Sequence, residues 1–191
     1  MARGGAFYDV PHVFEQYRRL RFEEEFPILA MEEPAFLDVL GPVTGVRIAD
    51  LGCGEGLLGR SLLEAGCARY LGIDGSANMV EAARETLRGT AGEVVRCDIE
   101  DFAPAPGSFD VVVSRMALHY VRDVAPVLAA CRAAASRVVF TVVHPIITTR
   151  GPARTSRTPT GSWTTTSCPG RGSRSGWAAG SPGITGPWRT T

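Results

Sequence analysis

The sequence predicts an α/β fold with a mostly parallel β-sheet between two layers of helices. Five short runs rich in β-branched residues alternate with stretches of helical periodicity. These runs are apolar without strict alternation, which is typical of parallel strands buried on both faces. A glycine-rich turn follows the first run, as in open sheets that bind a ligand at the carboxyl ends of their strands. Together the observations predict a doubly wound, Rossmann-like sheet of five strands between residues 46 and 143.

Each predicted element has a local signal. The predicted strands are residues 46–51, 69–74, 93–98, 109–114 and 137–143. Leucines recur at helical spacing from Leu57 until Gly66, which is a typical helix stop. Ser76 is a favourable N-cap for a helix that ends at Gly89, and a third helix begins near Asp123. Strands that alternate with helices in this way favour parallel pairing in one sheet.

Three segments are expected along the chain: an N-terminal helical segment, a cofactor-binding α/β domain and an irregular tail, at residues 1–45, 46–149 and 150–191. The stretch VFEQYRRLRFEEEF in the first segment is typical of a charged amphipathic helix. Two interpretations of this helix stay open, namely packing against the sheet edge or a lid over a ligand. A lid would bring Tyr8, His12 and Tyr17 close to bound molecules.

The composition limits the classes of partner. Residues 1–150 hold all 20 acidic residues but only 15 of the 20 arginines, so the main body is acidic. An acidic body disfavours nucleic acid as the partner. No apolar run reaches the roughly 20 residues of a membrane-spanning helix, and no apolar segment follows Met1 as in a secretory signal. The five cysteines lack C-x-x-C spacing, so we expect reduced thiols, no metal site and a cytoplasmic protein.

The turn ADLGCGEGLLG predicts a loop whose backbone approaches a ligand closely. A nucleoside triphosphate loop is excluded, because such loops need a lysine and the chain has none. A dinucleotide stays open as an alternative, since Gly54, Gly56 and Gly59 fit G-x-G-x-x-G and Asp74 follows at the required distance. Starting at Asp50, however, DLGCGEG also fits the pattern D-x-G-x-G-x-G.

Five segments in order extend the second pattern. They are ADLGCGEG, YLGIDGSANMVEAAR, VVRCDIEDF, GSFDVVVSRMALHYV and VVFTVVHPI. Between Tyr8 and Thr149 the chain thereby resembles the class I S-adenosylmethionine-dependent methyltransferases, especially their small bacterial members. The resemblance implies S-adenosylmethionine as the cofactor and methyl transfer as the activity. It stops after Thr149, where the family continues with a further helix and two antiparallel strands, so we expect those last two strands to be missing.

The resemblance implies a cofactor site made of Asp50, Gly52, Cys53, Gly54, Gly56, Asp74, Gly75, Met79, Asp98, Ile99 and Ser114, and Tyr17 of the possible lid is a further candidate for it. Asp50 would attract the ammonium group of the cofactor, and Asp74 would accept both ribose hydroxyls. Asp98 and Ile99 would hold adenine, and the backbone carbonyl of Ser114 would face the methionine part. Plainer interpretations stay open: helix capping for Asp50, solvated turns for Asp74 and Asp98, and core packing for Met79.

Methyl transfer needs a proton acceptor only if the methylated group carries a proton. His119 and His144 follow the last two predicted strands and are the candidate bases. A small molecule is the expected acceptor, because the sequence has no basic groove. Two alternatives stay open: a cofactor-binding remnant without catalysis, which a frameshift has truncated, and a nicotinamide-dependent oxidoreductase.

The tail is expected not to be an evolved protein segment. Of its residues from Gly151 to Thr191, 28 are Gly, Pro, Ser or Thr, and none is acidic. Back-translation in a shifted frame allows the texts WVVDDYFVPG and LGGRVTRYHRTVEDY, which look like the absent continuation of the family. We therefore predict a one-nucleotide slip between about Thr148 and Thr160 and little regular structure after it.

Overall fold

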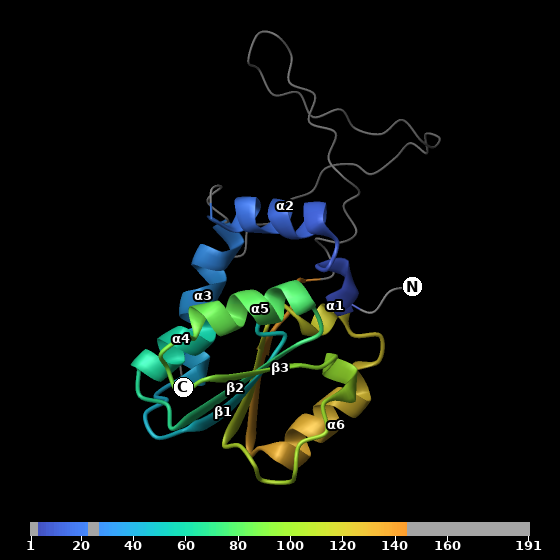
Figure 1. The fold of residues 1–191 in the computed structure, drawn as a ribbon. Coiled ribbons are helices and arrows are strands. Elements are labelled where there is room, and N and C mark those ends of the chain that lie inside the picture. Colours follow the sequence, from blue (N-terminus) through green and yellow to red (C-terminus); the bar gives the residue numbers. More distant parts are fainter. Residues whose placement is uncertain (1–3, 23–26, 145–191) are drawn as a thin grey trace, which may run out of the picture. The chain divides into compact units, whose positions relative to one another are not determined.

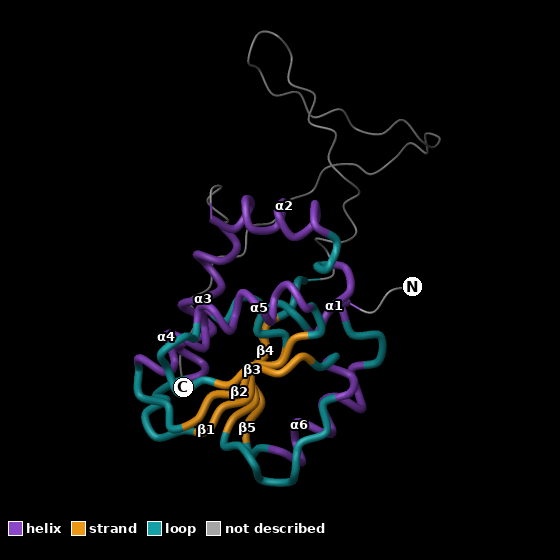
Figure 2. Tube along the Cα trace, in the orientation of Figure 1, coloured by secondary structure: helices purple, strands orange, loops and turns teal. Residues whose placement is uncertain are grey.

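Five parallel strands form the centre of the fold (Figures 1 and 2). The computed structural model describes residues 4–22 and 27–144. The strands lie in the order β3-β2-β1-β4-β5. Their bounds are Arg47–Leu51 (β1), Arg69–Asp74 (β2), Glu93–Arg96 (β3), Val111–Arg115 (β4) and Arg137–Thr141 (β5). The chain starts at the centre, moves outward to β3 and returns to the other side of β1, so the direction of winding changes between β1 and β4. Such a switch point is where doubly wound sheets bind ligands.

Helices cover both faces of the sheet. The helices that follow strands are Leu57–Glu64 (α4), Ala77–Thr86 (α5) and Val124–Ala134 (α6), with short 3-10 turns at Ile99–Asp101 (η1) and Leu118–Tyr120 (η2). As the sequence predicts, the Ser76 hydroxyl caps α5 by accepting the N–H of Met79 at 3.2 Å. Asp123 caps α6 by accepting the N–H of Ala125 at 3.1 Å. The predicted Rossmann-like α/β fold is therefore confirmed.

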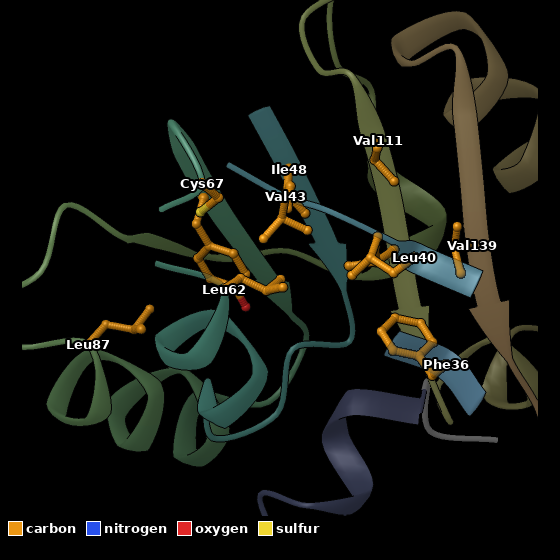
Figure 3. Close-up of a cluster of buried hydrophobic side chains, with 11 residues drawn as sticks. Phe36, Leu40, Val43, Ile48, Leu62, Cys67, Leu87, Val111 and Val139 are labelled. Carbon is orange, nitrogen blue, oxygen red and sulfur yellow. The ribbon is translucent and has the colours of Figure 1, made fainter. Parts of the chain in front are cut away.

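Two apolar clusters hold the layers together, one on each face of the sheet. The first joins strand residues such as Ile48 and Val111 to α3 and α4, and it includes the fully buried Leu40 (Figure 3). The second joins the opposite face to α6 through Val127 and Cys131, among others. Successive residues of a strand point to opposite faces, so each buried strand contributes side chains to both clusters. This explains why the strands are continuous apolar runs in the sequence.

The N-terminal segment differs from its prediction. The single helix expected over residues 13–26 is instead α2, at Pro11–Phe22, and it is preceded by the short helix α1 at Gly4–Phe7. Residues 23–26 lie outside the described residues. A further helix, α3 at Pro27–Leu40, was not predicted, because it has Pro34 in its interior and a mostly apolar surface rather than a charged amphipathic pattern. Its side chains enter the core: Phe36 and Leu40 are 1% and 0% exposed.

The predictions for the tail fall on residues 145–191, which lie outside the described residues, so the predicted frameshift stays a prediction. Within the described part of the chain, each helix is too short or too polar to cross a bilayer.

Candidate functional site

A cavity of about 440 Å³ opens at the carboxyl ends of β1, β2 and β4. Eleven of the predicted site residues line it: Asp50, Gly52, Cys53, Gly54, Asp74, Gly75, Met79, Asp98, Ile99, Tyr17 and His119. The cavity thus lies at the switch point of the sheet, where the topology places ligand sites. Three of the predicted residues, Gly56, Ser114 and His144, are not part of its wall.

The glycine loop between β1 and α4 lies directly over β2. Its N–H groups at Gly52 and Cys53 both donate to the carbonyl of Ile73, at 2.7 and 3.0 Å. Gly52, Gly54 and Gly56 all adopt positive φ, at 74°, 55° and 76°, which side chains other than glycine rarely adopt. A Cβ atom at Gly52 would collide with the side chain of Ala117. At Gly54, by contrast, the nearest atom to such a Cβ is the Tyr17 hydroxyl at 4.0 Å, so a side chain there would enter the cavity.

Asp74, the last residue of β2, is fixed by backbone donors. Its two carboxylate oxygens accept the N–H groups of Gly54 and Ser76, each at 2.9 Å. Desolvation raises the pKa of Asp74, although these two hydrogen bonds act in the opposite direction. Each oxygen keeps a further lone pair for another donor. The carboxylate therefore both orders the glycine loop and can accept hydroxyl groups of a ligand.

Asp50, in β1, is the most deeply buried acid of the cavity, with only 2% of its surface exposed. The Tyr70 hydroxyl donates to its carboxylate at 2.8 Å. Desolvation raises the pKa of Asp50 to about 6, against the opposing effects of Tyr70 and of the positive charge on Arg115. A cation that enters the cavity would lower the pKa of Asp50 again and stabilise its ionised form. This carboxylate is therefore suited to an ammonium group.

Asp98 and its neighbours form the far end of the cavity, beyond β3. Gly75 lies so close to the Asp98 carboxylate that a Cβ atom at position 75 would collide with it. Ile99 begins the turn η1, and Met79, on α5, is 3% exposed and lines the cavity as well as the core. Met79 thus belongs to the core and to the cavity wall, and its contact with adenine stays a prediction. An acid that shares a cavity wall with two apolar side chains can hold a flat heterocycle that carries an amino group.

The segment from α1 to α2 rests on three loops around the cavity, and we call residues 4–22 the N-terminal cap. At the β2–α5 loop, Asp9 accepts the Ser76 hydroxyl at 2.7 Å and the Asn78 N–H at 3.3 Å. At the glycine loop, Arg18 pairs with Glu55 at 3.0 Å. Beyond β4, the hydroxyl groups of Tyr8 and Tyr120 are 3.0 Å apart. Figure 1 shows α1 next to the start of α5.

Aromatic rings gather where the cap meets the cavity. The ring of Tyr8 makes edge contacts with Tyr17 and Tyr120, at centroid distances of 5.3 and 6.2 Å. Desolvation and the Tyr120 hydroxyl raise the pKa of Tyr8, so its hydroxyl group stays neutral. The imidazole of His119 lies against Tyr120, with ring centroids 4.3 Å apart, and desolvation lowers its pKa. Unprotonated His119 is thus present at neutral pH and can accept a proton.

The predicted residues outside the cavity wall have other surroundings. Gly56 directly precedes α4, and a Cβ atom there would approach the Cβ of Ala83 on α5 to 3.2 Å, so the two helices leave little space for a side chain. The Ser114 hydroxyl donates to the carbonyl of Leu51 at 2.8 Å and is buried. His144 is exposed and follows Val143, which does line the cavity. The ligand contacts expected of these three residues stay predictions.

Sequence reasoning missed a charged group at the end of β4. Arg115 lines the cavity, and its Nη2 lies 2.6 Å from the carboxylate of Glu32 on α3. Next to it, Met116 adopts a φ of 52°, which is strained for a residue with a side chain. The Met116 N–H donates to the carbonyl of Thr141 at 3.0 Å and so holds that conformation. An arginine directly after the predicted strand 109–114 was the available signal, but its partner lies 83 residues away.

Comparisons with known proteins agree with this geometry. Residues 48–137 match the family model described as a methyltransferase domain. A solved S-adenosylmethionine-dependent methyltransferase from Mesorhizobium loti is 36% identical, with a TM-score of 0.59, over 71% of this chain and 64% of its own. An uncharacterized protein of Haemophilus influenzae is 32% identical over 150 residues, which are 74% of this chain and 59% of that protein.

Two further relatives have different substrates in their names. A ubiquinone biosynthesis O-methyltransferase of Thiobacillus denitrificans is 37% identical over half of this chain and 42% of its own length. A ribosomal RNA small subunit methyltransferase C of Chromohalobacter salexigens is 38% identical over 52% of this chain and 30% of its own length. The chain thus spans less than two thirds of each of these relatives.

Proposed function

We propose that this protein, which resembles the class I S-adenosylmethionine-dependent methyltransferases and matches a methyltransferase domain over residues 48–137, transfers a methyl group from S-adenosylmethionine to a small-molecule acceptor. One observation carries the proposal. The acids Asp50, Asp74 and Asp98, which end or follow three neighbouring strands, line one cavity together with the glycine loop. Asp50 and Asp74 also hold Tyr70 and the glycine loop in place, and all three acids face the same cavity.

The cavity suits this cofactor better than a dinucleotide. S-adenosylmethionine has an ammonium group and a sulfonium centre but no phosphate, and five acidic residues line the cavity: Asp50, Glu55, Asp74, Asp98 and Glu100. These negative charges attract such a ligand and repel a pyrophosphate. The open space beside Gly54 leaves room for backbone contact with the ligand. The residues present therefore fit the cofactor.

The protein's own contribution to the reaction is binding, orientation and proton removal. The cofactor supplies a methyl group bound to a positively charged sulfur. Asp74 and Asp98 would fix the adenosine part, and Asp50 would fix the ammonium group. The cap would exclude water from the cavity, which strengthens each of these interactions. His119 would accept the proton of a hydroxyl or amine acceptor, because its pKa is lowered and it lines the cavity.

A small molecule is the proposed acceptor because the cavity is lined with acids and lies beneath the cap. A polyanion such as RNA would meet five acidic residues and a single arginine at this wall. A cytoplasmic location is part of the same proposal. It is supported by the free thiols of Cys53, Cys67, Cys97 and Cys131, which are typical of a reducing compartment.

Isothermal titration tests the cofactor. We expect S-adenosylmethionine and S-adenosylhomocysteine to bind and NADH not to bind. Gly54→Val should abolish binding because its side chain fills the cavity. Gly41→Val is the matched control: Gly41 has a similar φ of 67° in open surroundings, so it carries the same backbone strain without touching the ligand. Binding of NADH alone, or equal loss of affinity in both variants, would contradict the proposed cofactor site.

A methylation assay tests the acceptor. Formation of S-adenosylhomocysteine is measured with phenols, with primary amines and with ribosomal RNA as separate acceptors. We expect turnover only with small molecules, and His119→Gln should lower kcat while the affinity for S-adenosylhomocysteine is unchanged. His144→Gln is the comparison, since His144 lies outside the cavity wall. Turnover with ribosomal RNA alone would replace the small-molecule proposal.

A further inference from the structure

Arg115 is the single arginine in the wall of the cavity among the described residues. Only 12% of its side chain is exposed, and its guanidinium group lies over the ring of Phe36, 5.2 Å from the ring centroid. A nearly buried cation in an otherwise acidic wall is costly unless it has partners. Arg115 has two carboxylate partners, Glu32 and Glu33, and neither is part of the cavity wall.

The guanidinium group is only partly used by the protein. Its Nε and Nη2 atoms donate to Glu32, with the shortest distance 2.6 Å, and Nη2 also donates to Glu33 at 3.2 Å. Among the described residues, none accepts a hydrogen bond from Nη1. Glu32 is itself held by the Thr141 hydroxyl, which donates to it at 2.6 Å. Arg115 lines the cavity while its Nε and Nη2 atoms are held by the glutamates, so Nη1 is the donor that we consider for a ligand.

Arg115 stands beside the acid that we assign to the ammonium group. In the sheet, Asp50 pairs with Val113, and Arg115 follows Val113 by two residues on the same face of β4. The charge of Arg115 acts directly on the ionisation of Asp50. An α-amino acid carries its ammonium and carboxylate groups on one carbon atom. A cation next to the site of the ammonium group can therefore bind the carboxylate of the same ligand.

We propose that Arg115 binds the α-carboxylate of the cofactor through Nη1, and that Glu32 is the positioning residue that fixes the guanidinium group for this contact. This inference rests on the proposed function, because it assigns the amino-acid end of the same cofactor. Glu32 connects α3 to the ligand: it holds the arginine in one orientation, so the arginine loses little freedom when the carboxylate arrives. Thr141, at the end of β5, fixes Glu32 in turn.

The experiment compares two ligands that differ in one group. S-adenosylhomocysteine carries the carboxylate, whereas S-adenosyl-3-thiopropylamine lacks only that group and keeps the ammonium. Titration of the full chain with each ligand should show that Arg115→Gln lowers the affinity for S-adenosylhomocysteine at least about tenfold, as expected for a hydrogen bond to a charged group. Its affinity for the thiopropylamine should change less than about twofold.

Glu32→Gln should give a smaller loss with the same preference for one ligand, because the arginine remains but is held less firmly. Arg47→Gln is the matched control, since Arg47 forms an ion pair of 2.7 Å with Asp110 at the opposite end of the strands. It should alter neither affinity. If Arg115→Gln does not fold, two other variants replace it. The double variant Arg115→Gln/Glu32→Gln also removes the Glu32 charge that would be left without a partner. Arg115→Lys keeps the positive charge but lacks the fixed geometry of the guanidinium group. Both should show the same selective loss.

Equal losses for both ligands, or no loss for either, would overturn the assignment of Arg115. If the wild-type protein binds neither ligand, the proposed function fails instead, and the two failures are thereby distinguished. A third outcome is that Arg115→Gln loses affinity only for S-adenosylhomocysteine while Glu32→Gln loses none. Arg115 would then remain the binding residue, and the positioning role of Glu32 would be overturned.

Discussion

Asp50 combines a functional position with a cost in stability. Its carboxylate is buried at the end of the central strand and is neutral more often than an ordinary aspartate, because desolvation raises its pKa to about 6. The folded state therefore binds a proton that the unfolded state releases between the ordinary pKa of about 4 and this raised value. Folding stability from this group is present at low pH and is lost as pH rises through 6.

Asp50→Asn should therefore stabilise the free protein at pH 7.5 while it weakens cofactor binding. A shift of about two pKa units corresponds to about 3 kcal/mol, and we expect a gain of about 1–3 kcal/mol in the free energy of unfolding. The gain should vanish near pH 4, where the carboxyl group is protonated in both states. Urea unfolding of both proteins from pH 4 to pH 8 measures it, and titration with S-adenosylhomocysteine measures the loss of affinity.

Asp50→Glu is a suitable control, because it keeps the charge and changes only the length of the side chain. A less stable Asp50→Asn protein at pH 7.5 would contradict the prediction, since it would mean that the surroundings favour the ionised carboxylate.

The sequence predicted the site residues whose signal is local. Asp50, Asp74 and Gly54 were identifiable because a strand end, an acid and a glycine turn are consecutive in the chain. Arg115 and Tyr120 were not predicted as cavity residues, because their meaning depends on partners 83 and 112 residues away. A local pattern cannot indicate such pairs, since the fold brings them together only when the sheet and the N-terminal helices are in place.

At the scale of elements, the N-terminal cap is held by polar contacts rather than by a continuous core. Arg18 is 57% exposed in its pair with Glu55, and such exposed pairs contribute little. Asp9 is the strongest anchor: although desolvation opposes it, hydrogen bonds from Ser76 and Asn78 lower its pKa, and Arg96 lies 3.2 Å away. An element held in this way can open without unfolding the sheet.

We therefore predict that cofactor binding slows amide hydrogen exchange in residues 4–22. Asp9→Ala should weaken this protection and lower the affinity for S-adenosylhomocysteine a few-fold, because it removes an acid at the N-terminus of α5, worth about 0.3–1 kcal/mol. Exchange measured by mass spectrometry with and without S-adenosylhomocysteine checks both effects. Asp38→Ala, at an exposed acid of α3, is the control.

Unchanged exchange of the cap on binding would favour the other interpretation of the N-terminal helix, simple packing against the body.

The sequence predicted this helix but not α3, and the reason is physical. Phe36 and Leu40 of α3 are buried against the sheet, and most residues of this helix are apolar. Without an amphipathic pattern, the sequence alone does not distinguish such a helix from another buried segment.

At the scale of the whole molecule, β5 is an edge of the described sheet, and Phe140 on it is 45% exposed. An uncovered edge strand favours association with other chains. The predicted frameshift would account for this edge, because the shifted texts between Thr160 and Thr191 look like the continuation that the family has after its fifth strand. The doubly wound sheet itself could be predicted from residues 46–143, since each of its elements carries its own periodicity.

We expect the gene to hold one inserted or deleted nucleotide between codons 148 and 160. Restoring the frame should yield a chain with less association in analytical ultracentrifugation and higher methyltransferase activity, since acceptor contacts would return. A synonymous recoding of the same region serves as the control. A stop codon directly after the shift, or an unchanged sedimentation profile, would defeat the prediction.

The contact between α3 and β5 also has a consequence for synthesis on the ribosome. The Glu32–Thr141 hydrogen bond joins residues 109 positions apart, and Leu40 shares its cluster with Val139. At a synthesis rate of roughly 5–20 residues per second, α3 leaves the ribosome several seconds before its partner strand exists. During that interval its apolar surface is open to chaperones and to other nascent chains. The synthesis of β5, the last strand in the described part of the chain, therefore determines when α3 can complete its burial.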